Sequence, residues 1–129
     1  MSPLISLMKD QVDSLKYLGV HAGFLNSTLS KDEYVRLIHG IKSKKIKLLY
    51  IAPERLMNEK FISFIKGIPI SLIAVYEAHC ISQWGHDFRK SYLEIPDFLK
   101  KIEQRPQLLA LTATATAKVR EDIIEKLGL

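Results

Sequence analysis

The 129-residue sequence has a single cysteine, no long apolar run and no glycine-rich phosphate loop. One cysteine, Cys80, cannot form an internal disulfide, which favours a reducing, cytoplasmic compartment. No run of about 18 apolar residues is present, so the sequence predicts no membrane span. Residues 1–5 lack the basic region and cleavage site of a signal peptide. The six glycines do not fit the pattern G-x-x-x-x-G-K-[ST], so these residues contain no phosphate loop of that type.

The composition is that of an ordinary globular domain. Hydrophobic residues make up 47% of the chain and charged residues 26%, which excludes intrinsic disorder. A chain of this length buries about two thirds of its unfolded surface, enough for one core. The 19 basic and 14 acidic side chains give a net charge of +5, which suits an anionic partner without identifying it.

Helical and strand-like segments alternate along the chain, which predicts an α/β domain around a mainly parallel sheet. The expected strands lie at residues 20–25, 48–51, 71–75 and 107–111. The expected helices lie at residues 4–18, 30–41, 59–66, 92–102 and 117–127, the first of them opened by Ser2-Pro3. The continuous apolar run at 71–75 predicts a strand that is covered on both faces. No strand precedes the first helix, so the domain is expected to lack its first strand.

The carboxyl ends of the expected strands are the places where ligands bind in open α/β sheets. Four segments occupy such ends: residues 52–55, 76–79, 112–114 and the loop after Leu25. Glu77 is the strongest candidate, because an acid directly after a buried strand can act on metal-bound phosphate or on water. The alternative is a carboxylate that caps the next helical turn.

Four blocks of sequence resemble consecutive motifs of the RecQ family of ATP-dependent DNA helicases, in the family's order. They are SPLISLMKDQV (2–12), IAPERL (51–56), EAHCISQWGHDFR (77–89) and ALTATAT (110–116). The third block is the most specific, because it joins a helicase box to the aromatic-rich loop of that family. The resemblance covers essentially the whole chain.

The resemblance implies a RecA-like, three-layer α/β fold, with residues 1–129 forming a partial first motor domain that lacks its first strand and phosphate loop. It implies ATP-dependent 3′–5′ unwinding in DNA repair and recombination, with ATP and Mg²⁺ as cofactors of the complete helicase. The implied partners are single-stranded and forked DNA and the remainder of the helicase core. The implied location is cytoplasmic, and nucleoid-associated if the protein is bacterial.

Individual roles follow from the resemblance residue by residue. Glu77 is expected to orient or activate the attacking water, and His79 to couple the nucleotide site to the DNA-sensing loop. Thr112 and Thr114 are expected to link ATP hydrolysis to movement of the second motor domain. DNA contacts are implied for a larger set drawn from three of the motifs: Ser2, Lys9, Arg55, Trp84, Phe88 and Arg89.

Tyr76 departs from the family pattern, because the family has an Mg²⁺-binding Asp at this position. A phenol with a reference pKa of about 10 is neutral at pH 7, and Mg²⁺ prefers carboxylate and water oxygens. Losing even an indirect metal contact typically costs about 10–100-fold in affinity or activity. Mg²⁺-dependent hydrolysis is therefore expected to be severely impaired even in a complete helicase. Because the phosphate loop and the second motor domain are also absent from the sequence, the chain alone is expected neither to bind ATP tightly nor to unwind DNA. The alternative is a degenerate, non-catalytic module that keeps contacts to single-stranded DNA or protein.

Several of these residues also have a purely structural interpretation. His79, Cys80 and His86 lack the paired spacing of zinc sites, so packing and hydrogen bonding are expected rather than a zinc site. Cys80 is expected to behave as a small buried hydrophobe. Trp84 is either a core anchor or, if exposed, a stacking platform for DNA. The threonines at 112–116 fit a strand end followed by a helix N-cap, and the lysines at 42–47 fit a solvated turn better than a nucleic-acid contact.

Overall fold

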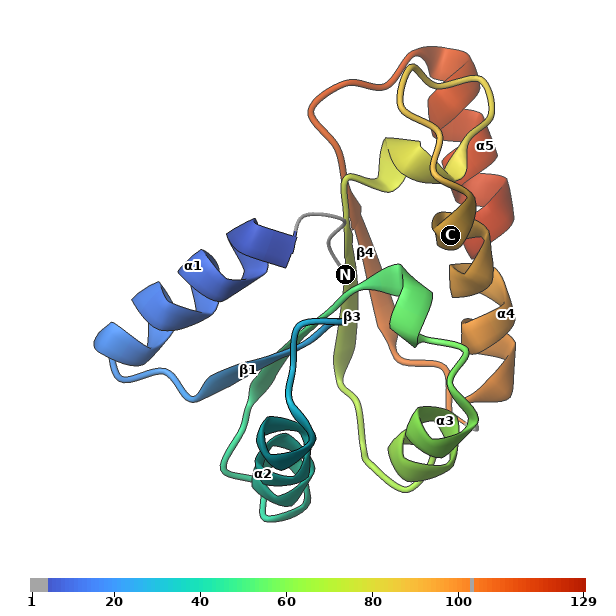
Figure 1. Cartoon of the computed structure of the whole chain (residues 1–129). Coiled ribbons are helices and arrows are strands. Elements are labelled where there is room, and N and C mark those ends of the chain that lie inside the picture. The colour runs from blue at the N-terminus through green and yellow to red at the C-terminus, as the bar shows by residue number, and fades with distance from the viewer. Residues whose placement is uncertain (1–4, 103) are drawn as a thin grey trace.

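Two pairs of parallel strands and five α-helices make up the described part of the computed structural model, residues 5–102 and 104–129 (Figure 1). The helices are α1 (Ile5–Tyr17), α2 (Lys31–Lys42), α3 (Glu59–Ile65), α4 (Glu94–Lys101) and α5 (Ala117–Leu127). The strands are β1 (Ala22–Leu25), β2 (Leu48–Ile51), β3 (Leu72–Tyr76) and β4 (Gln107–Leu111). Three short 3-10 helices are η1 (Pro53–Arg55), η2 (Ala78–Ile81) and η3 (Lys90–Leu93).

All strand pairings among the described residues are parallel, as the alternating pattern predicts. β1 pairs with β2 from Ala22 opposite Leu48, and β3 pairs with β4 from Leu72 opposite Gln107. The described strands form two separate two-stranded sheets rather than one continuous sheet. Parallel strands that pair end at the same edge. The loop after Leu25 therefore lies beside residues 52–55, and residues 76–79 lie beside residues 112–114.

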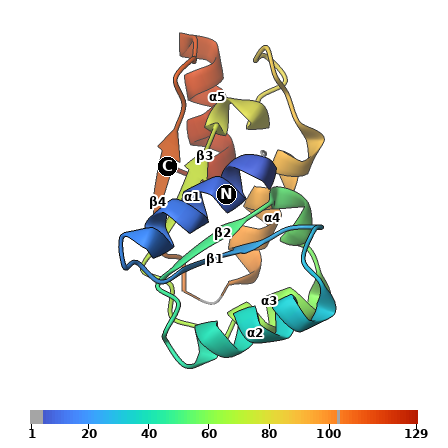
Figure 2. The same cartoon turned by 60° about the vertical axis from the view of Figure 1, so that its left-hand side comes forward.

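Helices flank each strand pair. α1 and α2 pack against β1 from opposite sides (Figure 2). α4 and α5 lie on one side of the β3–β4 pair (Figure 1), where Ile73 and Val75 pack into the hydrophobic core with Phe98 and Ile123. No helix of the described part is both long and apolar enough to cross a membrane.

The prediction that the third strand is covered on both faces is wrong for the described residues. Side chains alternate along β3, so Val75 is fully buried while Leu72 is 50% exposed and Tyr76 is 39% exposed. On β4, Leu109 and Leu111 lie on the same open face and are also exposed. A continuous apolar run predicts that a strand contributes to the core. Whether one face or both faces are covered depends on helices that are distant in the sequence.

Local capping signals set several of the element boundaries. Ser30 begins α2 with a complete capping box, in which Ser30 Oγ accepts from Glu33 N and Glu33 Oε1 accepts from Ser30 N. Thr116 caps α5 by accepting from Val119 N at 3.2 Å, which confirms the N-cap interpretation. Gly128 ends α5 with a left-handed φ of 67°.

The expected helices at residues 92–102 and 4–18 extend further than the observed α4 and α1. Tyr92 lies in η3, and α4 begins two residues later at Glu94, because the local chain first forms a 3-10 turn around the buried Tyr92. The apolar stripe of α1 buries Met8 and Val12, but the helix ends at Tyr17 and leaves Leu18 exposed. The expected helix start at Ser2-Pro3 lies outside the described residues.

Candidate functional site

The carboxyl ends of the two strand pairs carry two different groups of side chains. At the ends of β3 and β4, Glu77, His79, Thr112 and Thr114 come together, and we call them the acid–histidine cluster. At the ends of β1 and β2 a cavity is surrounded by cations, and we call it the basic pocket. Its cationic residues are Lys31, Arg55 and Lys60.

Glu77 turns the chain out of β3 with an unusual backbone conformation. It has φ 56° and ψ 45°, the left-handed region that costs about 1–2 kcal/mol for a residue with a Cβ atom. It occupies the N-cap position of η2, but its side chain makes no capping hydrogen bond, so the capping alternative is wrong. Its Oε2 lies 3.4 Å from His79 Nδ1 instead.

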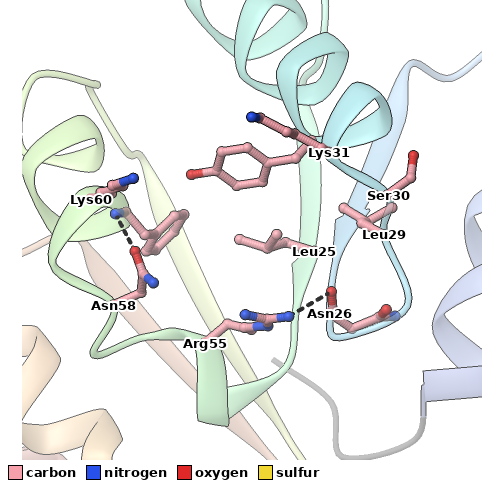
Figure 3. A pocket seen from close by; sticks show the side chains of 10 residues that line it. Leu25, Asn26, Leu29, Ser30, Lys31, Arg55, Asn58 and Lys60 are labelled. Atoms are coloured by element: carbon pink, nitrogen blue, oxygen red, sulfur yellow. Dashed lines mark hydrogen bonds between the residues drawn. The ribbon is translucent and has the colours of Figure 1, made fainter.

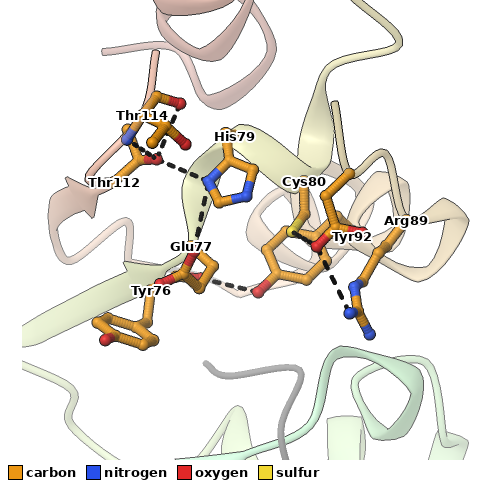
Figure 4. Close-up of polar contacts among 9 residues, drawn as sticks. Tyr76, Glu77, His79, Cys80, Arg89, Tyr92, Thr112 and Thr114 are labelled. Atoms are coloured by element: carbon orange, nitrogen blue, oxygen red, sulfur yellow. Dashed lines mark hydrogen bonds and ion pairs between the residues drawn. The ribbon is translucent and has the colours of Figure 1, made fainter. Parts of the chain in front are cut away.

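His79 joins the ends of the two strands. The side chain is almost fully buried, and Nδ1 lies 2.6 Å from the hydroxyl oxygen of Thr112 (Figure 4). A threonine hydroxyl can donate to an unprotonated imidazole nitrogen or accept from a protonated one, so this link is compatible with both states. Thr112 Oγ1 also accepts a hydrogen bond from Thr114 N at 3.3 Å. The segments predicted at the ends of the third and fourth strands are thus brought together.

Tyr76 is separated from this cluster by the alternation of the strand. Its ring points away from His79 (Figure 4) and lies on the open face of β3–β4. Its carbonyl oxygen accepts a hydrogen bond from the hydroxyl of Tyr92 at 2.7 Å. Tyr92 is fully buried, and burial raises the pKa of its phenol far above the usual value, so it remains a neutral donor. Sequence reasoning missed this role of Tyr92, since nothing local distinguishes it from a core aromatic.

The acid–histidine cluster does not fit a complete Mg²⁺–nucleotide site by itself. Glu77 supplies its one carboxylate, while Tyr76 offers a neutral phenol that is turned away. Mg²⁺ requires near-octahedral oxygen coordination and is usually held by carboxylates together with substrate phosphates. Since the sequence also lacks a phosphate loop, the described residues supply only part of such a site.

A second group of metal-ligating atoms lies beside the cluster. One ligand atom each of His79, Cys80 and Asp87 lies within 4.8 Å of the others, so Asp87 rather than His86 completes the triplet. His86 instead stacks on His79 with ring centroids 4.9 Å apart. Burial, followed by the charge of Asp87, raises the pKa of the Cys80 thiol. Cys80 is buried, as expected for a small hydrophobe.

The aromatic-rich loop exposes one of its three expected DNA contacts. Trp84 is 64% exposed, which contradicts the core-anchor alternative. Phe88 and Arg89 are half-buried. Arg89 Nη2 lies 3.5 Å from Asp87 Oδ2, and Arg89 N donates to Cys80 O. Arg89 is thus held within the loop, while the Trp84 ring faces solvent.

The basic pocket is a cavity of about 280 Å³ between the starts of α2 and α3 (Figure 3). Arg55, expected from the sequence, lines it and donates from Nη2 to Asn26 O at 3.5 Å. Lys31 is the first residue of α2 and Lys60 the second residue of α3. Sequence reasoning missed both lysines, although each belongs to a helix that follows a strand end. The full lining is Leu25, Asn26, Leu29, Ser30, Lys31, Tyr34, Arg55, Asn58, Lys60 and Phe61.

Asn26 holds the wall of this pocket in place. The side chain is almost fully buried, and its Oδ1 accepts from Thr28 N at 2.8 Å and from Thr28 Oγ1 at 2.6 Å. Its Nδ2 lies 3.9 Å from Met8 Sδ, which connects the loop after β1 to α1. Such Asx turns order a short loop, so Asn26 positions the carbonyl that Arg55 contacts.

The remaining expected DNA contacts lie elsewhere. Lys9 projects from α1 into solvent and pairs with Asp13 at 2.9 Å, and this hydrogen bond raises the pKa of Lys9. Ser2 lies outside the described residues. The lysines of residues 42–47 are exposed at the amino end of β2, opposite the ligand edge, in agreement with a solvated turn.

Comparisons with known proteins show which family this chain resembles. A family model described as DEAD/DEAH box helicase matches residues 1–123. The ATP-dependent DNA helicase RecQ of Bacillus subtilis is 50% identical over 129 residues, covering 100% of this chain and 22% of that protein. RecQ of Pasteurella multocida is 45% identical over 129 residues, covering 100% of this chain and 20% of that protein. The chain thus spans about a fifth of the length of these two relatives.

Two further comparisons agree with these. The probable ATP-dependent DNA helicase RecS of Bacillus subtilis is 44% identical over 130 residues, covering 100% of this chain and 26% of that protein. Among solved structures, the Hef helicase domain of Pyrococcus furiosus matches with a TM-score of 0.68 and 19% identity. That match covers 100% of this chain and 26% of the other chain. At this identity the likeness concerns the fold alone, and it supports the expected RecA-like α/β architecture.

Proposed function

This chain belongs to the DEAD/DEAH box helicase family, and from that premise we propose that residues 1–129 form part of the first motor domain of a RecQ-type helicase. The complete enzyme would unwind DNA in the 3′–5′ direction, driven by ATP and Mg²⁺, in repair and recombination. Its proposed substrates are single-stranded and forked DNA. Within it, this chain would contribute the acid–histidine cluster and part of the DNA track.

The observation that carries this proposal is the 2.6 Å contact between His79 Nδ1 and Thr112 Oγ1. A motor must transmit the state of its nucleotide site to elements that move on DNA. His79 lies between Thr112 and the carboxylate of Glu77, which is the one acid of the cluster. Thr112 in turn accepts a hydrogen bond from Thr114 N, in the segment that precedes α5. We assign His79 as the coupling residue and the two threonines as its relay.

Glu77 is assigned to the attacking water. Phosphoryl transfer depends on positioning and charge neutralisation more than on covalent chemistry by the protein, and bound ATP–Mg²⁺ supplies the reacting group. The Glu77 carboxylate can accept a hydrogen bond from a water and hold it for attack. The nearby imidazole of His79 restricts the orientation of that carboxylate, since Nδ1 lies 3.4 Å from Oε2.

DNA binding is assigned to the basic pocket and to Trp84. Contacts to phosphates provide affinity that does not depend on sequence, and aromatic rings stack on bases of any kind. The pocket gathers Arg55 with Lys31 and Lys60, and Trp84 offers an exposed ring. Lys9 and the half-buried Phe88 and Arg89 would add contacts along the same track.

The test uses a grafted helicase, in which this chain replaces the matching segment of Bacillus subtilis RecQ. We expect slow ATP hydrolysis with Tyr76 and an increase of about 10–100-fold in Tyr76→Asp, because the substitution restores a carboxylate at the metal position. Steady-state ATP hydrolysis with and without single-stranded DNA is the measurement, and Tyr17→Asp, at an exposed residue of α1, is the control. Equal rates for Tyr76→Asp and the parent would contradict the assignment.

A second candidate function is a non-catalytic module that binds single-stranded DNA or protein. The observation that favours it is the neutral, outward-turned phenol of Tyr76 at the family's metal position. On this alternative, the grafted helicase does not hydrolyse ATP even with Tyr76→Asp, while the chain alone still binds single-stranded DNA at low salt. Absence of both activities would exclude a stand-alone DNA-binding module.

A further inference from the structure

A lysine and a tryptophan from different segments are in contact at the end of the molecule where α5 begins. Lys118 Nζ lies 3.5 Å from the centroid of the Trp84 ring. Lys118 is the second residue of α5, and Trp84 belongs to the loop between η2 and η3, which Figure 1 shows beside the first turn of α5. An ammonium at this distance over an indole face is attracted by the ring quadrupole.

The backbone beneath Trp84 is held firmly while its ring stays outside. Trp84 N donates to the hydroxyl oxygen of the buried Ser82 at 3.2 Å, and Gly85 N donates to Ser82 O. A Cβ atom at Gly85 would lie 3.1 Å from His79 O, so the loop packs tightly over η2 at this point. The loop therefore fixes the backbone of Trp84 outside the core, and the contact to the ring itself comes from Lys118.

Lys118 is available for an anion. Its side chain is exposed, and none of the four ion pairs of the described residues includes it. The first turn of α5 contains no acidic residue. Asp122, four residues further along, pairs with Lys126 instead, and Glu121 forms no ion pair with Lys118 among the described residues. Its ammonium lies over one face of the Trp84 ring, and an indole ring has a second face on which a base can stack.

We propose that Trp84 and Lys118 act as one joint contact to single-stranded nucleic acid. A base stacks on the ring face turned away from Lys118, and the ammonium binds a phosphate next to that base. The contact between the two side chains holds the ring in position before the strand arrives, which reduces the ordering required on binding. This inference rests on the proposed function, which supplies single-stranded DNA as the partner.

The experiment measures binding of fluorescein-labelled oligothymidylate to the 129-residue chain by anisotropy, between about 50 and 200 mM salt. We expect Lys118→Ala to weaken binding by about 3–10-fold at the low-salt end and to reduce the salt slope by about 0.7, the value for one phosphate contact on a single strand. Trp84→Ala should weaken binding with no change in the slope. The matched control is Lys101→Ala, which removes the same charge from an exposed position in the last turn of α4.

Two further measurements separate a joint contact from two independent ones. The double variant should lose less affinity than the sum of the single losses, because each residue supports the other. Trp84 is the only tryptophan of the chain, so its fluorescence reports stacking directly. Lys118→Ala should reach the parent's degree of quenching, but at a higher oligonucleotide concentration.

The inference is overturned if Lys118→Ala binds as tightly as the parent or more tightly, if the salt slope does not change, or if the two losses are additive. In each of these cases the parent still binds DNA, so the proposed function stands. If the parent does not bind oligothymidylate at low salt, the stand-alone DNA-binding activity fails and this inference fails with it. Far-ultraviolet circular dichroism of each variant checks that the fold is retained.

Discussion

The carboxyl ends of β3–β4 and those of β1–β2 are equivalent places in two parallel strand pairs, yet they carry opposite chemistry. At the first, the nearly buried His79 is held by Thr112 and Glu77 at 2.6 and 3.4 Å. At the second, Lys31 and Lys60 are exposed around an open cavity, and Arg55 makes a single long hydrogen bond. A group that acts on one atom requires fixed geometry, whereas binding a polyanion requires charge near its path. Under the proposed function, this difference corresponds to a division between ATP turnover and DNA affinity.

Both strand ends nevertheless have a buried polar residue as support. Tyr92 donates to the last carbonyl of β3, and Asn26 orders the loop that follows β1. Each places polar atoms in the interior and satisfies them with hydrogen bonds, since an unpaired buried group costs about 1–3 kcal/mol. The two regions therefore differ in what they present to ligands and share how their backbone is fixed.

The largest expected effect tests the turnover side of this comparison. In the grafted helicase with Tyr76→Asp, Glu77→Gln should lower ATP hydrolysis by about 10²-fold or more, because an amide cannot accept a proton from water. Affinity for single-stranded DNA, measured by anisotropy, should not change. A loss of DNA binding that matches the loss of hydrolysis would show that the two regions are not separate.

An intermediate effect tests the binding side. Replacing Lys31, Arg55 and Lys60 together by Ala should weaken single-stranded DNA binding by about 10-fold or more at low salt, and should flatten its salt dependence. The control removes the same charge from the opposite end of the strand pair, with Ala at Lys44, Lys45 and Lys47. Equal losses in both triple variants would mean that net charge, and not the pocket, determines binding.

The smallest effect concerns the support of the β3 end. Tyr92→Phe removes the hydrogen bond to Tyr76 O and should lower the free energy of unfolding by about 1 kcal/mol at pH 7, as measured by urea denaturation. Because burial raises the pKa of Tyr92 in the folded state, its ionisation opposes folding. This contribution to stability is present below the unfolded pKa of about 10 and is lost as the pH rises above it.

The Phe variant should therefore lose less stability than the parent between pH 10 and the parent's alkaline unfolding. Tyr17→Phe provides the control, since Tyr17 is exposed on α1. If both tyrosine variants have the same alkaline profile as the parent, Tyr92 is not the group that responds to pH.

Much of the fold could be predicted because its signals are local. The expected bounds of β2, β4 and α5 agree with the structure, since apolar runs, Thr116 and Gly128 mark them directly. The separation into two strand pairs and the open face at Leu72 could not be predicted, because both depend on contacts between distant segments.

The candidate site divides in the same way. The place of Glu77 and His79 after an apolar strand, together with the motif around them, makes both predictable from the sequence, and Arg55 is predictable from its own motif. Lys31, Lys60 and Lys118 are not predictable, because each becomes a candidate only through a neighbour from another segment. The sequence allows two interpretations of Trp84, and only its exposure in the structure decides between them.

The sequence by itself determined the family and the parallel α/β character. It also determined that a G-x-x-x-x-G-K-[ST] phosphate loop is lacking and that position 76 holds a tyrosine instead of an acid. Each of these is a property of residue types and their order. Tertiary structure alone decided which strand ends meet, which faces stay open and which cations gather. Those properties depend on distances between residues far apart in the chain, such as His79 and Thr112 or Trp84 and Lys118. Local patterns do not specify such distances, because packing of the whole domain sets them.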